Sequence, residues 1–272
     1  MTAMITRFAP APTGFLHLGH VVNALYVWGM AEEADGLVRL RIEDHDRQRN
    51  RPEFEAAILE DLAWLGFAAT GPIVRQSERE EVYRAALATL VSGGRVYGCT
   101  CTRADLQRAP ADINGERRYP GTCRNRGMGL AEGMGWRVRL DPGEERFDDL
   151  LRGQQAQDPF AQSGDILVRD RLGNWTYQFA VVVDDIAQEI THVIRGMDLL
   201  PSTGRQIALA RLLGRVTPLR FAHHPLVMKT ATEKLSKSDG DSGVRDLRAA
   251  GWSAADVLAR ASALARQPKA QL

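Results

Sequence analysis

The segment that decides the fold runs from Ile5 to His20 and reads ITRFAPAPTGFLHLGH. Its first four residues form a short apolar run typical of a strand, and Pro10 and Pro12 then fix the backbone of a turn. From about Leu18 to Ala34 the apolar residues recur with helical spacing. We therefore predict a strand, a rigid turn and a helix. This order places the turn at the carboxyl end of a sheet, where open α/β folds bind ligands.

The chain beyond this segment continues the alternation of strands and helices. Leu37 to Glu43 alternates apolar and charged residues, which predicts a strand and completes a βαβ unit. Ser77 to Glu80 resembles a capping box that opens a helix to about Leu90, and Phe179 to Val183 predicts a strand buried on both faces. Further predicted elements are strands over 190–194 and 219–222 and helices over 54–65, 202–213, 244–250 and 254–265. The fold class is α/β, with a Rossmann-like parallel sheet and flanking helices.

The composition is that of an ordinary globular protein, with 44% hydrophobic and 25% charged residues in 272. No apolar stretch is long enough to cross a bilayer and the amino terminus has no secretory signal pattern, so we expect a cytoplasmic protein. The formal net charge of +1 gives no global attraction for a polyanion. Any nucleic-acid binding must therefore use a local basic surface, and no membrane partner is expected.

The two histidines of the opening segment, His17 and His20, lie at the predicted start of a helix. Unpaired backbone N–H groups and the helix dipole favour a phosphate there, and two imidazoles could stabilise charge that develops on a phosphoryl group. Gly19 lacks a side chain, so a nucleotide could lie close to the backbone. The alternative is structural, with one histidine capping the helix and the other packing.

A second phosphate-binding candidate is KLSKS, residues 234–238, which places Lys234 and Lys237 among small polar residues in a predicted loop. Two lysines suit the binding of a triphosphate and the release of pyrophosphate. Taken alone, such a segment is most often a solvated turn. No GxxxxGK[ST] phosphate loop occurs in the chain.

The three cysteines, Cys99, Cys101 and Cys123, all lie within 25 residues in a Gly- and Pro-rich segment of little periodicity. With Tyr119 they offer three thiolates and a phenol, a set that favours one tetrahedral, structural Zn²⁺. Unligated buried thiols are the alternative, and Asp112 or water could replace Tyr119 as the fourth ligand. We expect a zinc-stapled insertion over 97–146.

These motifs together resemble the class I aminoacyl-tRNA synthetases, and specifically their glutamyl branch. The similarity rests on RFAPAPTGFLHLGH and KLSKS, on RIED at 41–44, on TYQFAVVVDD at 176–185 and on THVIRGMDLL at 191–200. The pattern Cys-x-Cys followed by Tyr-x-x-x-Cys is similar to the zinc site of one subgroup, the glutamyl-queuosine tRNA(Asp) synthetases.

The resemblance implies a role for each matching residue. Glu43 would bind the α-amino group of glutamate, Tyr177 would supply a hydroxyl, and Arg7 and Arg195 would bind anionic groups, Arg195 with the fork geometry of a guanidinium. The full implied glutamate site is Arg7, Ala9, Ala11, Glu43, Tyr177 and Arg195. The implied ATP site is His17, Gly19, His20 and Lys237. His17, His20, Lys234 and Lys237 would act in catalysis by positioning and by offsetting negative charge, with Mg²⁺ accompanying the ATP.

Two positions depart from the family pattern. Ala11 stands where the family usually carries serine, which removes one possible hydrogen bond to the substrate, worth about 0.5–1.5 kcal/mol. Met197 stands where a glutamate is usual, which removes a charge next to Arg195.

The resemblance implies a ligase that activates L-glutamate with ATP and transfers it to the queuosine base in the anticodon of tRNA(Asp). The predicted domains are a catalytic domain over 1–96 and 147–238, the insertion over 97–146 and a helical segment over 239–272. Only 34 residues follow Ser238, so we expect no anticodon-binding domain. The plausible phosphate contacts are Arg103, Arg108, Arg117, Arg118, Arg124 and Arg126. We expect a monomer.

Two other functions fit parts of the sequence. A short glutamyl-tRNA synthetase would charge the acceptor end of a tRNA, and the small size of the chain argues against it. A non-catalytic RNA-binding protein derived from a synthetase would not be expected to keep intact HLGH and KLSKS segments.

Overall fold

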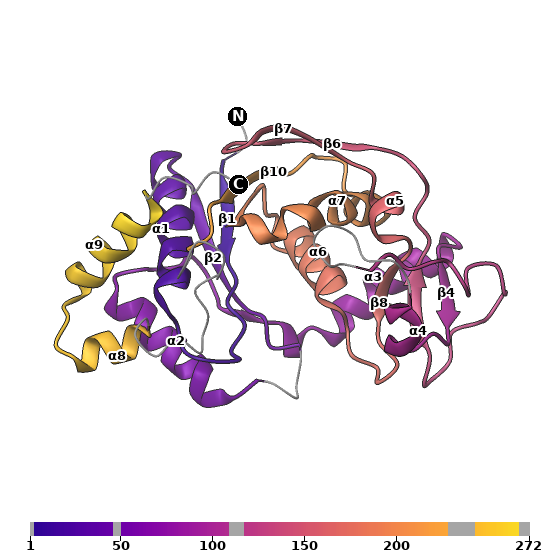
Figure 1. Cartoon of the computed structure of the whole chain (residues 1–272), viewed down its shortest axis with the longest axis horizontal. Helices are drawn as coiled ribbons and strands as arrows, with labels where there is room; N and C mark the ends of the chain where they lie inside the picture. The colour runs from indigo at the N-terminus through magenta and orange to yellow at the C-terminus, as the bar shows by residue number, and fades with distance from the viewer. Residues whose placement is uncertain (1–2, 46–49, 109–116, 228–242, 267–272) are drawn as a thin grey trace.

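The computed structural model describes residues 3–45, 50–108, 117–227 and 243–266 (Figure 1). Lys234, Lys237 and Asp112 lie outside the described residues. The helices are α1 Leu18–Glu33, α2 Pro52–Trp64, η1 Gln76–Glu78, α3 Glu80–Ser92, α4 Arg103–Gln107, α5 Pro159–Ser163, α6 Tyr177–Ala187, η2 Met197–Ser202, α7 Thr203–Leu212, α8 Val244–Ala249 and α9 Ala254–Ala265. The strands are β1 Ile5–Phe8, β2 Leu37–Ile42, β3 Val74–Arg75, β4 Val96–Cys99, β5 Gly135–Val138, β6 Glu145–Asp149, β7 Gly153–Gln157, β8 Ile166–Arg169, β9 His192–Gly196 and β10 Arg220–His224.

Two largely parallel sheets form the centre of the molecule. One has the order β1-β2-β3 with every pair parallel, and the other has the order β7-β6-β10-β9, in which only β7 is antiparallel to its neighbour. The backbone N–H of Ile5 donates to the Thr191 hydroxyl at 2.8 Å, and the backbone N–H of Thr191 donates to the Ile5 carbonyl at 2.9 Å. These bonds join the edge strand β1 to the start of β9. The predicted α/β fold with a parallel sheet is confirmed.

The predicted βαβ unit of β1, α1 and β2 is also confirmed, and its chain reversal depends on a glycine. Gly36 follows α1, and its backbone N–H donates to the Ala31 carbonyl at 2.7 Å. A Cβ atom at this position would lie 2.8 Å from both the carbonyl oxygen and the Cβ of Met4. The absence of a side chain therefore lets the end of the helix pass against β1 before β2 begins.

The prediction of a strand over Phe179–Val183 is wrong, because these residues lie inside helix α6. The helix is buried on all sides from Phe179 to Asp185, so its sequence shows no polar face. A short continuous apolar run is equally compatible with a buried strand and a buried helix. As a consequence Asp184 and Asp185 lie in the last turns of a helix instead of after a strand.

A third sheet, with the order β4-β5-β8, is antiparallel and lies beside α3 and α6 (Figure 1). We call the part of residues 96–169 that contains β4, α4, β5 and β8 the antiparallel region. The hairpin of β6 and β7 falls within these residue numbers but is not included, because it belongs to the sheet with β9 and β10. The antiparallel region contains the three cysteines. Its third strand, β8, lies after residue 146, where the predicted insertion ends.

The predicted capping box at Ser77 is wrong. The Ser77 hydroxyl donates to Asp44 at 2.5 Å instead of capping a helix, while α3 begins at Glu80 after Arg79, with no side-chain cap. Glu80 accepts a hydrogen bond from the Trp175 indole at 2.6 Å. Glu80 therefore ties the start of α3 to Trp175, and Ser77 ties the preceding turn η1 to Asp44.

Helix α9 packs against α1, as Figure 1 shows on the left, and α8 lies beside α2, where Arg245 and Arg248 pair with Glu60. The backbone of Gly243 forms a β-bridge with His17, and the N–H of Val244 donates to the Leu16 carbonyl at 2.9 Å. The chain therefore returns to the start of α1 directly after residues 228–242. Within the described ranges, no helix combines the length and apolar character needed to span a bilayer.

Candidate active site

A buried carboxylate on α6 organises the carboxyl ends of β1 and β2. Asp185 Oδ1 accepts from Arg7 Nε at 3.1 Å and from an Arg41 terminal nitrogen at 2.8 Å. Arg41 is fully buried and also lies 3.4 Å from Glu43. Burial works to raise the pKa of Asp185, but the two arginines outweigh it and hold that pKa below its ordinary value. The carboxylate therefore stays ionised and fixes both guanidinium groups.

The predicted glutamate-binding residues Arg7, Glu43, Tyr177 and Arg195 come together around this carboxylate. Burial raises the pKa of Glu43, and the charges of Arg41 and Arg7 oppose the increase. Burial also raises the pKa of Tyr177. The charges of Arg195 and Arg7 oppose this increase, and the charge of Glu43 adds to it. Two guanidinium groups, one carboxylate and one phenol thus lie close enough to influence one another's pKa. The cations are complementary to the two carboxylates of glutamate, and the Glu43 carboxylate is complementary to its amino group.

Arg195 on β9 is fixed by neighbours on three sides. Its Nε donates to His223 Nε2 at 2.9 Å, and its terminal nitrogens donate to Gln206 Oε1 at 2.7 Å and to Thr203 Oγ1 at 2.9 Å. A longer bond of 3.4 Å reaches the Leu199 carbonyl. Burial lowers the pKa of Arg195 below its ordinary value, and contact with Tyr177 partly offsets the decrease. Most of its donors are therefore used within the protein.

The proline turn connects the two parts of this cluster. Glu43 donates its backbone N–H to the Pro10 carbonyl at 3.0 Å, and Thr13 donates to the Ala11 carbonyl at 2.8 Å. Ala9 and Ala11 are half-buried beside these bonds. The turn therefore positions the backbone at the end of β2 as well as the start of α1.

The histidine pair forms the amino-terminal cap of α1. His17 Nδ1 accepts from the Gly19 backbone N–H at 3.0 Å, and His20 Nδ1 accepts from the His17 backbone N–H at 3.1 Å. The ring centroids are 3.9 Å apart. Because each Nδ1 accepts a hydrogen bond, the proton of each neutral ring lies on Nε2. The structural alternative for this pair is thus realised in part, because both rings take part in the cap of α1.

Gly19 has a packing reason in addition to the predicted approach of a nucleotide. A Cβ atom at this position would lie 2.8 Å from Cε1 of the His17 ring. The His17 cap could not form as observed with a larger residue at position 19.

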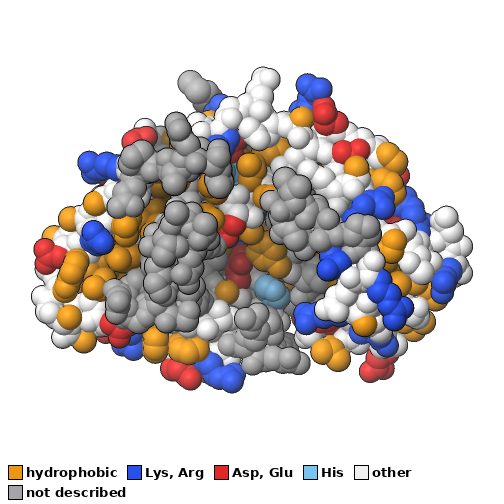
Figure 2. Space-filling view, in the orientation of Figure 1, with side chains coloured by type: hydrophobic (Ala, Val, Ile, Leu, Met, Phe, Trp, Pro, Cys, Tyr) orange, Lys and Arg blue, Asp and Glu red, His pale blue; other side chains and the backbone are white. Residues whose placement is uncertain are grey.

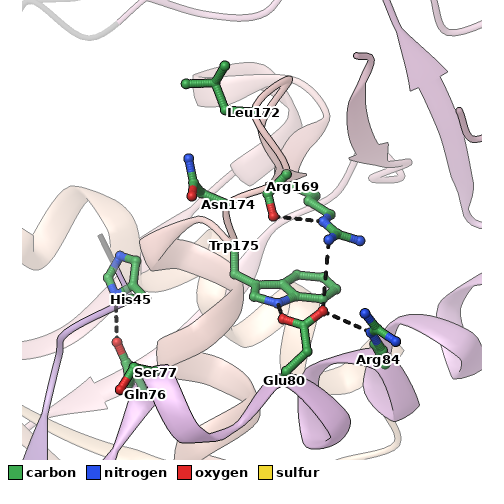
Figure 3. A pocket seen from close by; sticks show the side chains of 10 residues that line it. His45, Gln76, Ser77, Glu80, Arg84, Arg169, Leu172, Asn174 and Trp175 are labelled. Carbon is green, nitrogen blue, oxygen red and sulfur yellow. Dashed lines mark hydrogen bonds and ion pairs between the residues drawn. The ribbon is translucent and has the colours of Figure 1, made fainter. Parts of the chain in front are cut away.

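Beside this cluster lies a polar cavity of about 370 Å³ (Figure 3). His45, two residues after Glu43, and Trp175, two residues before Tyr177, are among its lining residues. The Glu80 carboxylate lies between the Trp175 indole and Arg84, as Figure 3 shows. Arg84 Nε donates to this carboxylate at 2.8 Å. The cavity therefore adjoins two elements that carry predicted glutamate-binding residues.

The sulfur atoms of Cys99, Cys101 and Cys123 all lie within 4.8 Å of one another. A tetrahedral Zn²⁺ with Zn–S bonds of about 2.3 Å requires sulfur pairs about 3.8 Å apart, and a Zn–O bond of about 2.0 Å requires an S···O separation of about 3.5 Å. Cys101 and Cys123 are 3.7 Å apart, and Cys99 Sγ is 3.5 Å from Tyr119 Oη. The four side chains therefore fit one zinc ion.

The surroundings of this cluster favour a thiolate. Burial works to raise the pKa of Cys123, but hydrogen bonds from the backbone and hydroxyl of Thr100, and from Cys101 and Tyr119, outweigh it and lower the pKa to about 7. Arg137 stacks on the Tyr119 ring at 3.7 Å from the centroid. We call Cys99, Cys101, Tyr119 and Cys123 the thiol cluster.

Arginine side chains gather over the antiparallel region in Figure 2. The predicted phosphate contacts are not equivalent, however. Arg124 bonds to Asp165 and to the Leu140 carbonyl, and Arg118 donates to the Phe160 carbonyl, so both also support the fold. Arg103, Arg108, Arg117 and Arg126 are exposed.

Several residues of the site were not predicted. Asp185 was noted only as the end of a supposed strand, and the buried pair Asp149 and His223 was not singled out. Their positions are 74 residues apart in the chain, so no local pattern marks them. Met197, which stands where the family usually has glutamate, is in contact with an arginine: its sulfur accepts a hydrogen bond from Arg152 at 3.6 Å.

The comparisons with known proteins agree with this geometry. Residues 3–262 match the model of the catalytic domain of class I tRNA synthetases (E and Q). A glutamyl-Q tRNA(Asp) synthetase of Bordetella bronchiseptica is 46% identical over 241 residues, covering 87% of this chain and 75% of that protein. One from Geobacter sulfurreducens is 43% identical over 99% of this chain and 87% of its own.

A solved structure agrees as well. The glutamate tRNA ligase of Elizabethkingia meningosepticum, crystallised with its amino acid, superposes with a TM-score of 0.74 at 32% identity. The match covers 88% of this chain and 53% of that one, so the chain spans about half of the longer enzyme. On these matches, the chain belongs to the class I tRNA synthetases (E and Q) and, within them, to the family of glutamyl-Q tRNA(Asp) synthetases.

Proposed function

We propose that this protein activates L-glutamate with ATP and transfers the glutamyl group to queuosine in tRNA(Asp). The observation that carries the proposal is the grouping of Arg7, Glu43, Tyr177 and Arg195 around Asp185, at the end of the strand that leads into the histidine pair. The names of relatives that share 41–46% of their residues with this chain support the choice of acceptor.

In the first step the α-carboxylate of glutamate attacks the α-phosphorus of ATP, giving glutamyl-adenylate and pyrophosphate. Glu43 would bind the ammonium group, and Arg7 and Arg195 would bind anionic groups of the substrate. Arg7 uses Nε and one terminal nitrogen within the protein, at 3.1 Å and 3.4 Å. Its other terminal nitrogen would donate to the substrate. Alignment of the two reactants then supplies much of the rate enhancement.

His17 and His20 at the start of α1 would position the phosphates and offset their negative charge, with Mg²⁺ bound to the ATP. Lys234 and Lys237 would complete the triphosphate site. Their placement lies outside the described residues, but the backbone of Gly243, six residues after Lys237, bridges to His17. This bridge supports a common site for the two motifs.

In the second step the queuosine nucleoside attacks the carbonyl carbon of the adenylate and AMP leaves. The cavity lined by His45, Trp175 and Glu80 would receive the acceptor nucleotide, because it adjoins Glu43 and Tyr177. Single-stranded RNA bases that are splayed out of a loop are typically bound in such polar and aromatic surroundings. The exposed arginines of the antiparallel region would bind neighbouring phosphates.

The thiol cluster would hold one structural Zn²⁺ with four protein ligands, which leaves no open position for a catalytic water. Its role would be to stabilise the antiparallel region that carries these arginines.

The test of activation is ATP–pyrophosphate exchange with glutamate in the absence of tRNA. We expect glutamate-dependent exchange by the wild-type protein, and loss of at least about 100-fold in kcat/KM for His20→Ala, since a removed donor to developing charge typically costs this much. The exposed Arg126→Ala variant is the matched control and should exchange normally. A wild-type protein that shows no exchange, with or without tRNA, would support the non-catalytic alternative.

The test of the acceptor uses radioactive glutamate with two preparations of tRNA(Asp), one with queuosine and one without it. We expect label only on the first. Equal labelling of both, or label that is lost when the 3′ end is removed, would instead identify an enzyme that charges the acceptor end.

A further inference from the structure

A second buried network, Asp149–His223, lies behind Arg195. Asp149 ends β6 and His223 lies in β10, and neither side chain is exposed to solvent. Asp149 Oδ2 is 2.5 Å from His223 Nδ1, and the Asp149 carboxylate also accepts the backbone N–H groups of His223 and Leu151. The other ring nitrogen of His223 faces Arg195 Nε at 2.9 Å. One chain of contacts thus connects β6, β10 and β9.

The partners decide the tautomer of His223. Arg195 Nε can only donate, so His223 Nε2 must accept and the ring proton must lie on Nδ1, where Asp149 accepts it. Burial and the nearby charge of Arg195 lower the pKa of His223 to about 4, and hydrogen bonds to His223 and Leu151 hold the pKa of Asp149 below its ordinary value in spite of burial. A neutral imidazole between a carboxylate and a guanidinium is therefore the form that satisfies every group.

The same contacts limit what Arg195 can offer a ligand. A guanidinium has five N–H donors, and four of them are directed at His223, Gln206, Thr203 and the Leu199 carbonyl. Among the described residues one N–H is not directed at these four acceptors; it lies on the terminal nitrogen bonded to Gln206, and the guanidinium is also hydrogen-bonded to Tyr177. Arg195 is thus held as a fixed charge with a single donor, which differs from the two-donor fork expected from its residue type.

We propose that Asp149 and His223 are positioning residues that hold Arg195 in this single-donor orientation, and that glutamate binding depends on the acceptor at His223 Nε2. The proposal rests on the proposed function, because it takes Arg195 as part of the glutamate site. Neither residue touches the substrate. Their effect should therefore fall on the binding of glutamate and not on the binding of ATP.

The experiment compares variants of His223 and Asp149 in ATP–pyrophosphate exchange, with separate titrations of glutamate and ATP. His223→Leu removes the acceptor, and we expect the KM for glutamate to rise by about tenfold or more while the KM for ATP changes by less than about twofold. His223→Gln places an amide oxygen near the position of Nε2, and we expect it to recover most of the loss. Asp149→Asn can donate to Nδ1 and favour the wrong tautomer, so we expect a loss like that of His223→Leu.

Two controls separate positioning from folding. His192→Gln alters a part-buried histidine three residues before Arg195 on the same strand and should leave both KM values unchanged. Thermal unfolding of each variant shows which of them are folded, and Asp149→Asn with His223→Gln decides the matter if His223→Leu does not fold.

Unchanged glutamate KM in folded Asp149→Asn, equal increases in both KM values, or a His223→Gln variant no better than His223→Leu would each overturn the proposal while the proposed function stands. A wild-type protein without glutamate-dependent exchange would instead contradict the proposed function, on which the proposal depends.

Discussion

The two halves of this molecule fix their functional side chains by different means. In the parallel-sheet region, which carries the glutamate-binding candidates, Asp185 and Asp149 hold Arg7, Arg41 and Arg195 through buried hydrogen bonds. In the antiparallel region the thiol cluster brings together three sulfurs and a phenol that fit a metal ion. The first arrangement pairs opposite charges within the protein, whereas the second leaves soft ligands facing one another.

The difference shows where each half is vulnerable. A buried ion pair is costly to form, and removing one member leaves the other charged and unpaired, so each carboxylate in the parallel-sheet region depends on its partners. A metal site depends on the metal concentration instead, because binding energy adds to the stability of the folded state. Four changes should separate the two kinds of dependence.

The largest effect is expected for Asp185→Asn, which leaves the buried guanidinium groups of Arg7 and Arg41 without their shared carboxylate. We expect a loss of about 3–5 kcal/mol in the free energy of unfolding, measured by urea titration, together with loss of glutamate-dependent exchange. The control is Asp141→Asn, which removes an exposed ion pair with Arg95 and should cost less than about 1 kcal/mol. Similar values for the two variants would show that the parallel-sheet region does not depend on its buried charges.

The substitution Cys123→Ser, which removes a proposed zinc ligand, should act on the antiparallel region. We expect zinc content to fall from one ion per chain to none, with a loss of about 3 kcal/mol at a free zinc concentration 100-fold above Kd. Limited proteolysis should then cut within the antiparallel region, while glutamate-dependent exchange persists. If glutamate-dependent exchange were lost together with the protease resistance of the antiparallel region, the two halves would be stabilised together.

Acidification should weaken the parallel-sheet region. The pKa of His223 is about 4 in the folded protein against about 6.5 for a free histidine, so the unfolded chain binds more protons between these values. The stability that depends on neutral His223 is therefore present above pH 6.5 and is lost as the pH falls towards 4, by about 3 kcal/mol. Asp149, Arg195 and His224 are the charged or titratable groups that act on this ring, and Arg152 donates to the backbone carbonyl of His223.

The measurement is the free energy of unfolding from pH 8 to pH 4 for the wild type and for His223→Gln. The variant should show a shallower dependence in this range. All six histidines lie outside the antiparallel region, so none of them titrates there. Identical pH profiles would contradict the neutral, buried His223.

The smallest effect is expected for Asp61→Asn on α2. Asp61 is buried, its two carboxylate oxygens have no hydrogen-bond partner among the described residues, and burial raises its pKa to about 6. The folded protein binds more protons than the unfolded chain between pH 4 and 6, so this carboxylate lowers stability once it ionises. We expect Asp61→Asn to stabilise the protein by about 1 kcal/mol at pH 7 and not at pH 4.

The control for this variant is Glu60→Gln, which removes the exposed partner of Arg245 and Arg248 and should be neutral or slightly destabilising. An Asp61→Asn variant that is less stable than the wild type at pH 7 would mean that the Asp61 carboxylate is paired with a cation in solution.

The success of sequence analysis differed between local and distant features. The strand, turn and helix of the opening segment were predicted because their signals lie within a few residues of one another. The spacing of Cys99, Cys101 and Cys123 likewise predicted a cluster, and the three sulfurs do lie together. Features of this kind depend on neighbours in the chain, so a sequence pattern records them.

Features that depend on distant neighbours were missed. The apolar run before Asp184 was read as a strand because full burial removes the polar face that identifies a helix. The pairing of Asp149 with His223 and the four donors used by Arg195 arise only when β6, β9 and β10 adopt their register. The resemblance pointed to Arg195, and only the folded contacts show how few of its donors remain for a ligand.

The attachment of Gly243 and Val244 to Leu16 and His17 uses peptide groups alone. Side-chain replacement along this seam therefore does not remove the hydrogen bonds, provided the backbone can still reach them. The chain at Gly243, six residues after Lys237, is thus fastened beside the start of α1 by its own backbone, so this end of the lysine segment has a fixed anchor next to the histidine pair.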